Sequence, residues 1–126
     1  MNNRISKTME GKMDILQRRS GNIVILDMHG AISLGESREK FAQVMEDLFQ
    51  EKDRNVLVNF SGINYVDSTG IGELVGYLNK FIENNRQLKL LRPHDRIRKL
   101  LEITKLDTMF QIYYDEEEAL KSFTNG

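Results

Sequence analysis

A carboxylate and two hydroxyls stand side by side at Asp67, Ser68 and Thr69, immediately before the glycines Gly70 and Gly72. A hydroxyl can accept a phosphate, and all three polar residue types cap helices, because their oxygens accept hydrogen bonds from first-turn amides. Apolar residues with helical spacing follow, which places the segment at a helix N-terminus. Unpaired amides and the helix dipole there favour a phosphate. Two interpretations therefore stand, a helix cap and a phosphorylation site.

The glycines of this helix do not match a nucleotide-binding loop. The spacing of Gly70, Gly72 and Gly76 differs from the dinucleotide fingerprint, and no Gly-Lys-Ser/Thr sequence occurs. Each glycine costs up to about 1 kcal/mol relative to alanine inside a helix. We therefore expect a compensation, either tight packing of the helix on a sheet or an exposed backbone that a partner protein can approach closely.

Other kinds of chemistry have little support in the sequence. A serine hydrolase needs a base beside its nucleophile, and no Gly-x-Ser-x-Gly motif surrounds Ser68. His29 and His94 lack a metal-binding spacing, and cysteine is absent. A receiver domain has a similar length and α/β pattern, but the paired acidic residues expected near its start are missing. We therefore expect no enzymatic activity, no metal and no cofactor.

Composition limits the partners and the compartment. The 126 residues carry 18 basic and 19 acidic side chains, for a net charge of -1, so no overall field attracts nucleic acid or an anionic membrane. No stretch of the sequence has the apolar length of a membrane span or of the core of a signal peptide, so we expect a protein that is neither exported nor membrane-spanning. The absence of cysteine fits a reducing compartment, and the expected location is the cytoplasm.

Strand-like and helical patterns alternate along the chain. Short apolar runs predict strands at residues 22–28, 55–60, 88–91 and 109–113, with a short edge strand around residues 13–16. Helical spacing covers residues 36–50 and 71–82, a third helix with Pro93 in its first turn, and a fourth capped by Asp115. The Ser61-Gly62 pair predicts a turn that ends the 55–60 strand. The pattern predicts one α/β domain at residues 14–126, with a mostly parallel sheet, and a tail at residues 1–13.

Residues 65–72, Tyr-Val-Asp-Ser-Thr-Gly-Ile-Gly, resemble the Asp-Ser-Ser/Thr-Gly-Leu/Ile-Gly signature of STAS-family anti-sigma factor antagonists. The strands before and after this segment also fall where that family has them, and the resemblance extends over about residues 14–123. It implies a STAS-like mixed, mostly parallel sheet with about four helices packed against it. It also implies that an anti-sigma factor, itself a serine kinase, phosphorylates Ser68.

The resemblance implies that the unphosphorylated form binds the anti-sigma factor and thereby frees the sigma factor. Phosphorylation then makes the antagonist dissociate from the anti-sigma factor, and a PP2C-type phosphatase removes the phosphate. The resemblance places Asp67, Thr69, Gly70 and Gly72 in the docking site and Glu73 and Tyr77 beside it. Ser33 stands where relatives often carry an aspartate, so kinase recognition is expected to differ there. Thr69 is a second candidate for the phosphoacceptor.

A second role for the domain stays open on the sequence alone. The domain can instead be a scaffold or relay module in a multi-protein stress-signalling complex, whereas the antagonist is expected to be a monomer or weak dimer.

Four basic residues cluster around Pro93, namely Arg92, Arg96, Arg98 and Lys99, with only Asp95 opposing them. The cluster is either a solvated helix face or a contact for an acidic partner, and it is too narrow for nucleic acid.

Overall fold

The computed structural model describes residues 13–51 and 54–123. Five strands and four α-helices lie within them, in the order β1 (Met13–Ser20), β2 (Ile23–Ile32), α1 (Glu36–Gln50), β3 (Asn55–Val66), α2 (Ser68–Glu83), β4 (Leu88–Leu91), α3 (Asp95–Ile103), β5 (Ile112–Tyr113) and α4 (Glu116–Ser122). A 3-10 turn, Leu106–Thr108, precedes β5. The predicted α/β class is confirmed. None of the helices in the described ranges is long and apolar enough to cross a membrane. The predicted tail lies outside the described residues, except for Met13, which begins β1.

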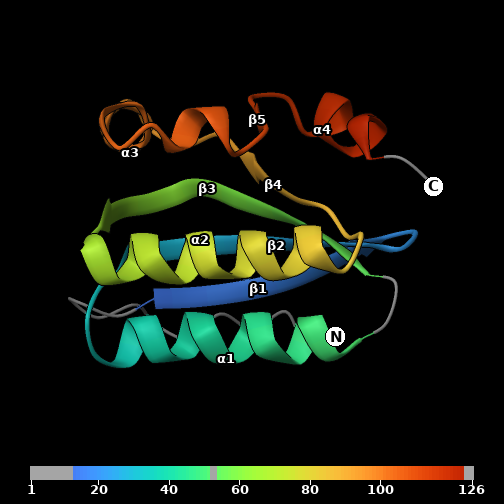
Figure 1. Cartoon of the computed structure of the whole chain (residues 1–126), viewed down its shortest axis with the longest axis horizontal. Coiled ribbons are helices and arrows are strands. Elements are labelled where there is room, and N and C mark those ends of the chain that lie inside the picture. The colour runs from blue at the N-terminus through green and yellow to red at the C-terminus, as the bar shows by residue number, and fades with distance from the viewer. Residues whose placement is uncertain (1–12, 52–53, 124–126) are drawn as a thin grey trace.

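The strands form one sheet in the order β1-β2-β3-β4-β5. β1 runs antiparallel to β2, and all other neighbours are parallel, so the sheet is mixed and mostly parallel, as predicted. Each parallel pair needs a crossover, which α1, α2 and α3 supply in turn. α1 and α2 lie side by side against the sheet (Figure 1).

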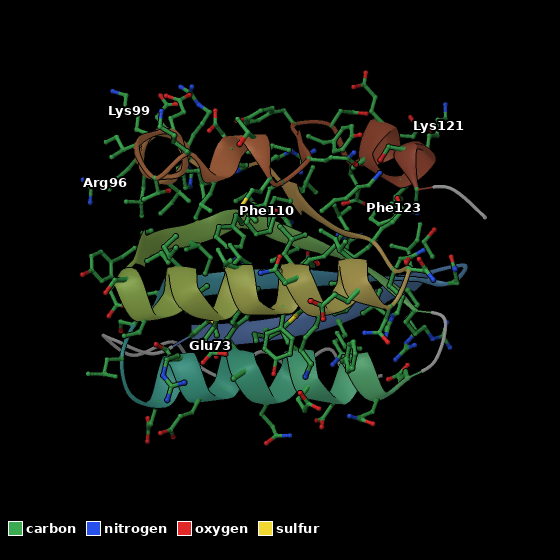
Figure 2. The ribbon with its side chains drawn as sticks, viewed as in Figure 1. Glu73, Arg96, Lys99, Phe110, Lys121 and Phe123 are labelled. Atoms are coloured by element: carbon green, nitrogen blue, oxygen red, sulfur yellow. The ribbon has the colours of Figure 1, made fainter. Side chains whose placement is uncertain are left out.

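Alternating side chains of the strands supply two apolar clusters, one on each face of the sheet. In β2, Val24 and Leu26 belong to the larger cluster beneath α1 and α2, whereas Ile23 and Ile25 belong to the smaller one beneath α4. Phe110 joins the larger cluster and Phe123 the smaller (Figure 2). The sheet is therefore buried on both faces, as expected for parallel strands with crossover helices.

The predicted strand at residues 55–60 was expected to end at a Ser61-Gly62 turn. This is wrong, because the corresponding strand, β3, continues to Val66. Gly62 is needed for a close approach between strands. A Cβ built there would lie 2.5 Å from the carbonyl oxygen of Met28 and 2.6 Å from the ring of His29. The register between β2 and β3 shifts at this point. The glycine therefore marks an irregularity inside the sheet, which a serine-glycine pair cannot reveal in sequence.

The third helix begins later than predicted. His94 is the residue before the first turn of α3, so Pro93 precedes the cap and lies outside the helix. β4 is also short and pairs only with the first part of β3, from Val56 to Asn59. No described strand continues this edge beside residues 60–66 of β3, and α3 packs there instead. The end of β3 that leads into α2 is therefore bordered by α3 and not by a further strand (Figure 1).

Candidate functional site

Asp67 is the N-cap of α2, one of the three alternatives left by the sequence. Its Oδ1 accepts hydrogen bonds from the amides of Thr69 and Gly70, each at 3.0 Å, and from the Thr69 hydroxyl at 2.7 Å. The hydroxyl bond is the main reason why the pKa of Asp67 lies below its usual value, and the amide bonds add to it although desolvation opposes them. The carboxylate is therefore ionised at neutral pH and held in one orientation.

The other oxygen of Asp67 reaches a neighbouring segment of the chain. Oδ2 accepts a hydrogen bond from the Leu34 amide at 2.9 Å, and the Asp67 amide donates to the Ile32 carbonyl at 3.1 Å. Residues 33–35 form the loop between β2 and α1, and this loop also contains Ser33, whose carbonyl accepts from the Ser37 hydroxyl at 3.0 Å. Asp67 thus joins two loops at the carboxyl ends of adjacent parallel strands, the usual place for a functional site in such sheets.

The two hydroxyls that follow Asp67 differ in their environment. Ser68 is the first residue of α2 and is exposed, and its hydroxyl makes no hydrogen bond to any described residue. The Thr69 hydroxyl, in contrast, is partly buried and donates to Asp67. Ser68 is therefore the hydroxyl that an external enzyme can reach without breaking the helix cap.

The three glycines of α2 divide between the two compensations predicted for them. A Cβ on Gly70 would lie 2.7 Å from the carbonyl oxygen of Ile32 and 2.9 Å from a methyl group of Val66, so this glycine allows α2 to pack tightly on the sheet. Gly72 and Gly76 are exposed, and a Cβ at either position would have no neighbour within 4 Å. They leave a bare strip of helix backbone beside Ser68.

The two residues expected beside the docking site, Glu73 and Tyr77, lie between α1 and α2. Glu73 forms an ion pair with Arg38 of α1 at 2.7 Å (Figure 2). Tyr77 is only 9% exposed, and its hydroxyl lies 3.1 Å from the Ala42 carbonyl and 3.2 Å from a Glu46 carboxylate oxygen, with its proton shared between the two. Tyr77 therefore holds α2 against α1. Its place beside the docking site stays a prediction, and the partner would meet this side chain mainly at its edge, because α1 covers most of it.

Sequence reasoning missed two contributors to this region, Leu34 and Arg38. The Leu34 side chain is 72% exposed although it is large and apolar, and its amide fixes the Asp67 carboxylate. Both residues lie more than thirty positions from their partners, at separations of 33 and 35. No local pattern could have connected them, because the contacts arise only when the two crossovers fold side by side.

The sequence matches the STAS domain family over residues 14–119. The chain belongs to this family. An anti-sigma-B factor antagonist of Staphylococcus aureus (strain NCTC 8325 / PS 47) is 36% identical over 70 residues, which are 56% of this chain and 65% of the relative, just under two thirds of its length.

Among solved structures, an anti-sigma factor antagonist from Mycobacterium paratuberculosis superposes on the STAS domain with a TM-score of 0.80 at 15% identity, over 89% of this chain and 94% of the other. Unphosphorylated SpoIIAA gives a TM-score of 0.71 at 20% identity, over 88% and 99% of the two chains. The phosphorylated form of Bacillus SpoIIAA gives 0.68 at 18% identity, over 85% and 96%. At these identities the superpositions show a shared fold.

Proposed function

We propose that this STAS-domain protein is an anti-sigma factor antagonist controlled by phosphorylation of Ser68. The family and the name of its Staphylococcus aureus relative support the general role. The observation that carries the specific proposal is the arrangement of two adjacent hydroxyls, of which Thr69 is bound to the Asp67 cap and Ser68 is exposed and unbonded among the described residues. A kinase can thus modify Ser68 while the helix start remains intact.

The docking surface combines Ser68 with two neighbouring features. The exposed Leu34 side chain lies on the loop that Asp67 ties to α2, and Gly72 exposes helix backbone one turn beyond Ser68. An exposed apolar side chain and a stretch of helix backbone without side chains favour close contact with a protein partner. Both can be removed from water on binding without burying an unpaired charge. Ser33 lies in the same loop, at the position where the family resemblance leads us to expect an acidic residue.

A phosphate on Ser68 would act locally. The amides of Thr69 and Gly70 already donate to Asp67, so the phosphate does not find them free and stays in solvent beside an ionised carboxylate. It would add about -1.5 to -2 charges and three acceptor oxygens to the docking surface. A partner that fits the neutral serine would then meet bulk and negative charge, so release requires no change of fold.

The proposed cycle needs two partner enzymes. The anti-sigma factor acts as a serine kinase and transfers the terminal phosphoryl group of ATP to Ser68 Oγ, which loses its proton, and ADP leaves. A PP2C-type phosphatase hydrolyses the phosphoserine with water and returns the free hydroxyl and inorganic phosphate. Binding of the unphosphorylated form to the anti-sigma factor frees the sigma factor.

Intact-mass measurement and phosphosite mapping of the protein from its source organism test the proposal. We expect one phosphate on Ser68 in the wild type, none in Ser68→Ala, and an unchanged modification in Thr69→Val. Anti-sigma factor kinases of that organism, purified and titrated one by one, should bind Ser68→Ala, and Ser68→Glu should bind at least about tenfold more weakly because of the added charge.

Three results would contradict this assignment. A phosphate on Thr69 would move the switch to the neighbouring hydroxyl. A chain that is never modified under any growth condition, together with equal affinities of Ser68→Ala and Ser68→Glu, would remove the switch. Stable high-order assemblies in sedimentation experiments, with no binding to an anti-sigma factor, would favour the scaffold or relay role instead.

A further inference from the structure

An apolar groove lies between the end of β3 and α3, outside the docking surface described above. Tyr65 and Val66 of β3 form one wall, and the other wall comes from α3, with Ile97, Leu100 and Ile103 as its apolar residues. The groove encloses about 330 Å³. Its outermost residues are large and unusually exposed for their type, since Ile103 is 79% and Tyr65 49% accessible to solvent.

The groove exists because β4 is too short to cover β3. β4 pairs with β3 only as far as Asn59, and α3 crosses the gap that the missing pairing leaves. The apolar residues of α3 therefore face in two directions. Ile97 and Leu101 are buried in the core, whereas Ile103 at the C-terminal end of the helix lies over the groove. An isolated exposed isoleucine is ordinary, but one that lines a groove with an exposed tyrosine marks a contact surface.

Two cations stand at the rim of this groove, Arg96 and Lys99 (Figure 2). Neither forms a hydrogen bond or an ion pair with any residue in the described ranges. The neighbouring Arg98 differs, because it pairs with Asp95 at 3.3 Å and Glu102 at 3.0 Å on its own helix. Part of the basic cluster around Pro93 is thus neutralised within α3, and the part that borders the apolar groove is not.

We propose that this groove binds an acidic, amphipathic segment of a partner protein. Its apolar side chains would lie between Tyr65 and Ile103, and its carboxylates would pair with Arg96 and Lys99. Charge complementarity selects this occupant, because an apolar floor with a basic rim excludes a basic segment and gives an uncharged one no compensation for the two desolvated cations. The proposal concerns a second surface and does not depend on phosphorylation of Ser68.

Two synthetic peptides with the same leucine pattern test this directly, one with glutamate and one with lysine at every polar position. Each is titrated into the full chain while backbone-amide NMR shifts are recorded. We expect the glutamate peptide to shift the resonances of Tyr65, Leu100 and Ile103, at least about tenfold more tightly than the lysine peptide, and to weaken as salt is raised. Ser68→Ala should bind it equally well, which separates this test from the proposed switch.

Matched variants distinguish the contributions of charge and apolar contact. Lys99→Glu should weaken the glutamate peptide and strengthen the lysine peptide, whereas Lys121→Glu, on α4 at the far end of the molecule (Figure 2), should change neither. Ile103→Ser should lower the affinity about tenfold through lost apolar burial. Ile82→Ser, at a residue that is 56% exposed near the end of α2, should have no effect. All four positions are exposed, so the fold is retained.

The proposal is overturned if both peptides bind equally, if the shifts fall outside the groove, or if Ile103→Ser and Ile82→Ser behave alike. Laurate that shifts the same resonances when the glutamate peptide does not would identify the groove as a lipid site. Concentration-dependent shifts of these resonances without any peptide would identify a contact between copies of this chain. Either outcome replaces the acidic segment as the occupant.

Discussion

The Leu34 amide donates a hydrogen bond to Asp67 across two loops, and this 2.9 Å contact connects the start of α2 to the loop before α1. A single carboxylate therefore caps a helix with one oxygen and orients a neighbouring loop with the other. Both segments carry residues of the proposed docking surface, Ser68 on the helix and Leu34 on the loop. The positions of both residues therefore depend on Asp67, although its carboxylate is engaged in hydrogen bonds within the protein and is not offered to a partner.

The first prediction concerns this cap. Asp67→Ala should lower the free energy of unfolding by about 1–2 kcal/mol, because three first-turn donors and the Leu34 amide lose their acceptor. Chemical denaturation measures this change. Asp115→Ala removes the cap of α4, which accepts a single amide bond at 3.0 Å, and should cost less. We also expect Asp67→Ala to weaken partner binding strongly and Asp115→Ala to leave it unchanged. Equal losses of affinity in the two variants would contradict the role of Asp67 in shaping the docking surface.

The second prediction separates the packed glycine from the open ones. Gly70→Ala should destabilise the protein by about 1–3 kcal/mol, since its new methyl group would overlap the Ile32 carbonyl and the Val66 side chain. Gly76→Ala should instead stabilise it by up to about 1 kcal/mol, because the position is open and alanine favours a helix. Thermal unfolding of the two variants side by side checks the opposite signs. Two changes of the same sign would refute the division.

Gly72 provides the third prediction, because it is as open as Gly76 but lies closer to Ser68. Gly72→Ala should stabilise the fold as Gly76→Ala does, by up to about 1 kcal/mol. If partner backbone approaches this strip, the added methyl group should weaken binding of the anti-sigma factor about tenfold, whereas Gly76→Ala should change it by less than about twofold. Calorimetric titration of both variants makes the comparison. Full affinity in Gly72→Ala would place the contact elsewhere.

The sequence predicted most of the elements because each is specified by local patterns. The apolar spacing in residues 36–50 matches α1 to the residue, and Asp115 caps α4 as expected. The errors occur where distant segments meet. The Ser61-Gly62 pair has the composition of a turn, and only the close approach of β2 shows that Gly62 lies inside a strand. The contact of Tyr77 with α1 is likewise not encoded within α2. Likewise, the groove beside Ile103 follows from the short pairing of β4, which no pattern within α3 encodes.

Tyr77 gives the fourth prediction. Burial first, and then its hydrogen bond to Glu46, raises the pKa of Tyr77 to about 12. The raised pKa means that its stabilising contribution is complete below the ordinary tyrosine pKa of about 10 and is lost as pH rises through the folded value. Ultraviolet titration should therefore show a late tyrosine ionisation step, at a pH near 12. Tyr77→Phe should remove this late step and cost about 1 kcal/mol of stability.

The matched control for that variant is Tyr65→Phe, because Tyr65 is half exposed and its hydroxyl has no hydrogen bond within the described ranges. It should leave both the late ionisation step and the stability unchanged. Neither variant should alter affinity for the anti-sigma factor by more than about twofold, since Tyr77 acts between α1 and α2. A large loss of affinity in Tyr77→Phe at unchanged stability would show that Tyr77 contacts the partner directly.

A fifth prediction concerns Arg18 of β1, which joins β2 to α4 on the face of the sheet that α4 covers. Its guanidinium binds Asp27 of β2 at 2.6 and 3.0 Å and Glu116 of α4 at 2.8 and 3.0 Å. The hydrogen bond from Arg18 is the main cause of a lowered pKa at Glu116. At Asp27 burial opposes ionisation, but hydrogen bonds from Arg18 and Asn59 together outweigh it, and the pKa is lowered there too.

Arg18→Ala should therefore cost about 1–3 kcal/mol near neutral pH, because two partly buried carboxylates lose their charged partner. Lowered carboxylate pKa values stabilise the fold above the unfolded pKa of about 4, and this contribution disappears as pH falls through the folded values. The difference between wild type and Arg18→Ala in urea denaturation should thus be complete near neutral pH and shrink only as the pH falls below about 4. Arg19→Ala, which removes an exposed pair with Glu51, should cost at most about 1 kcal/mol. A gap for Arg18→Ala that stays constant with pH would show that packing of the arginine stem, rather than its charge, stabilises this face.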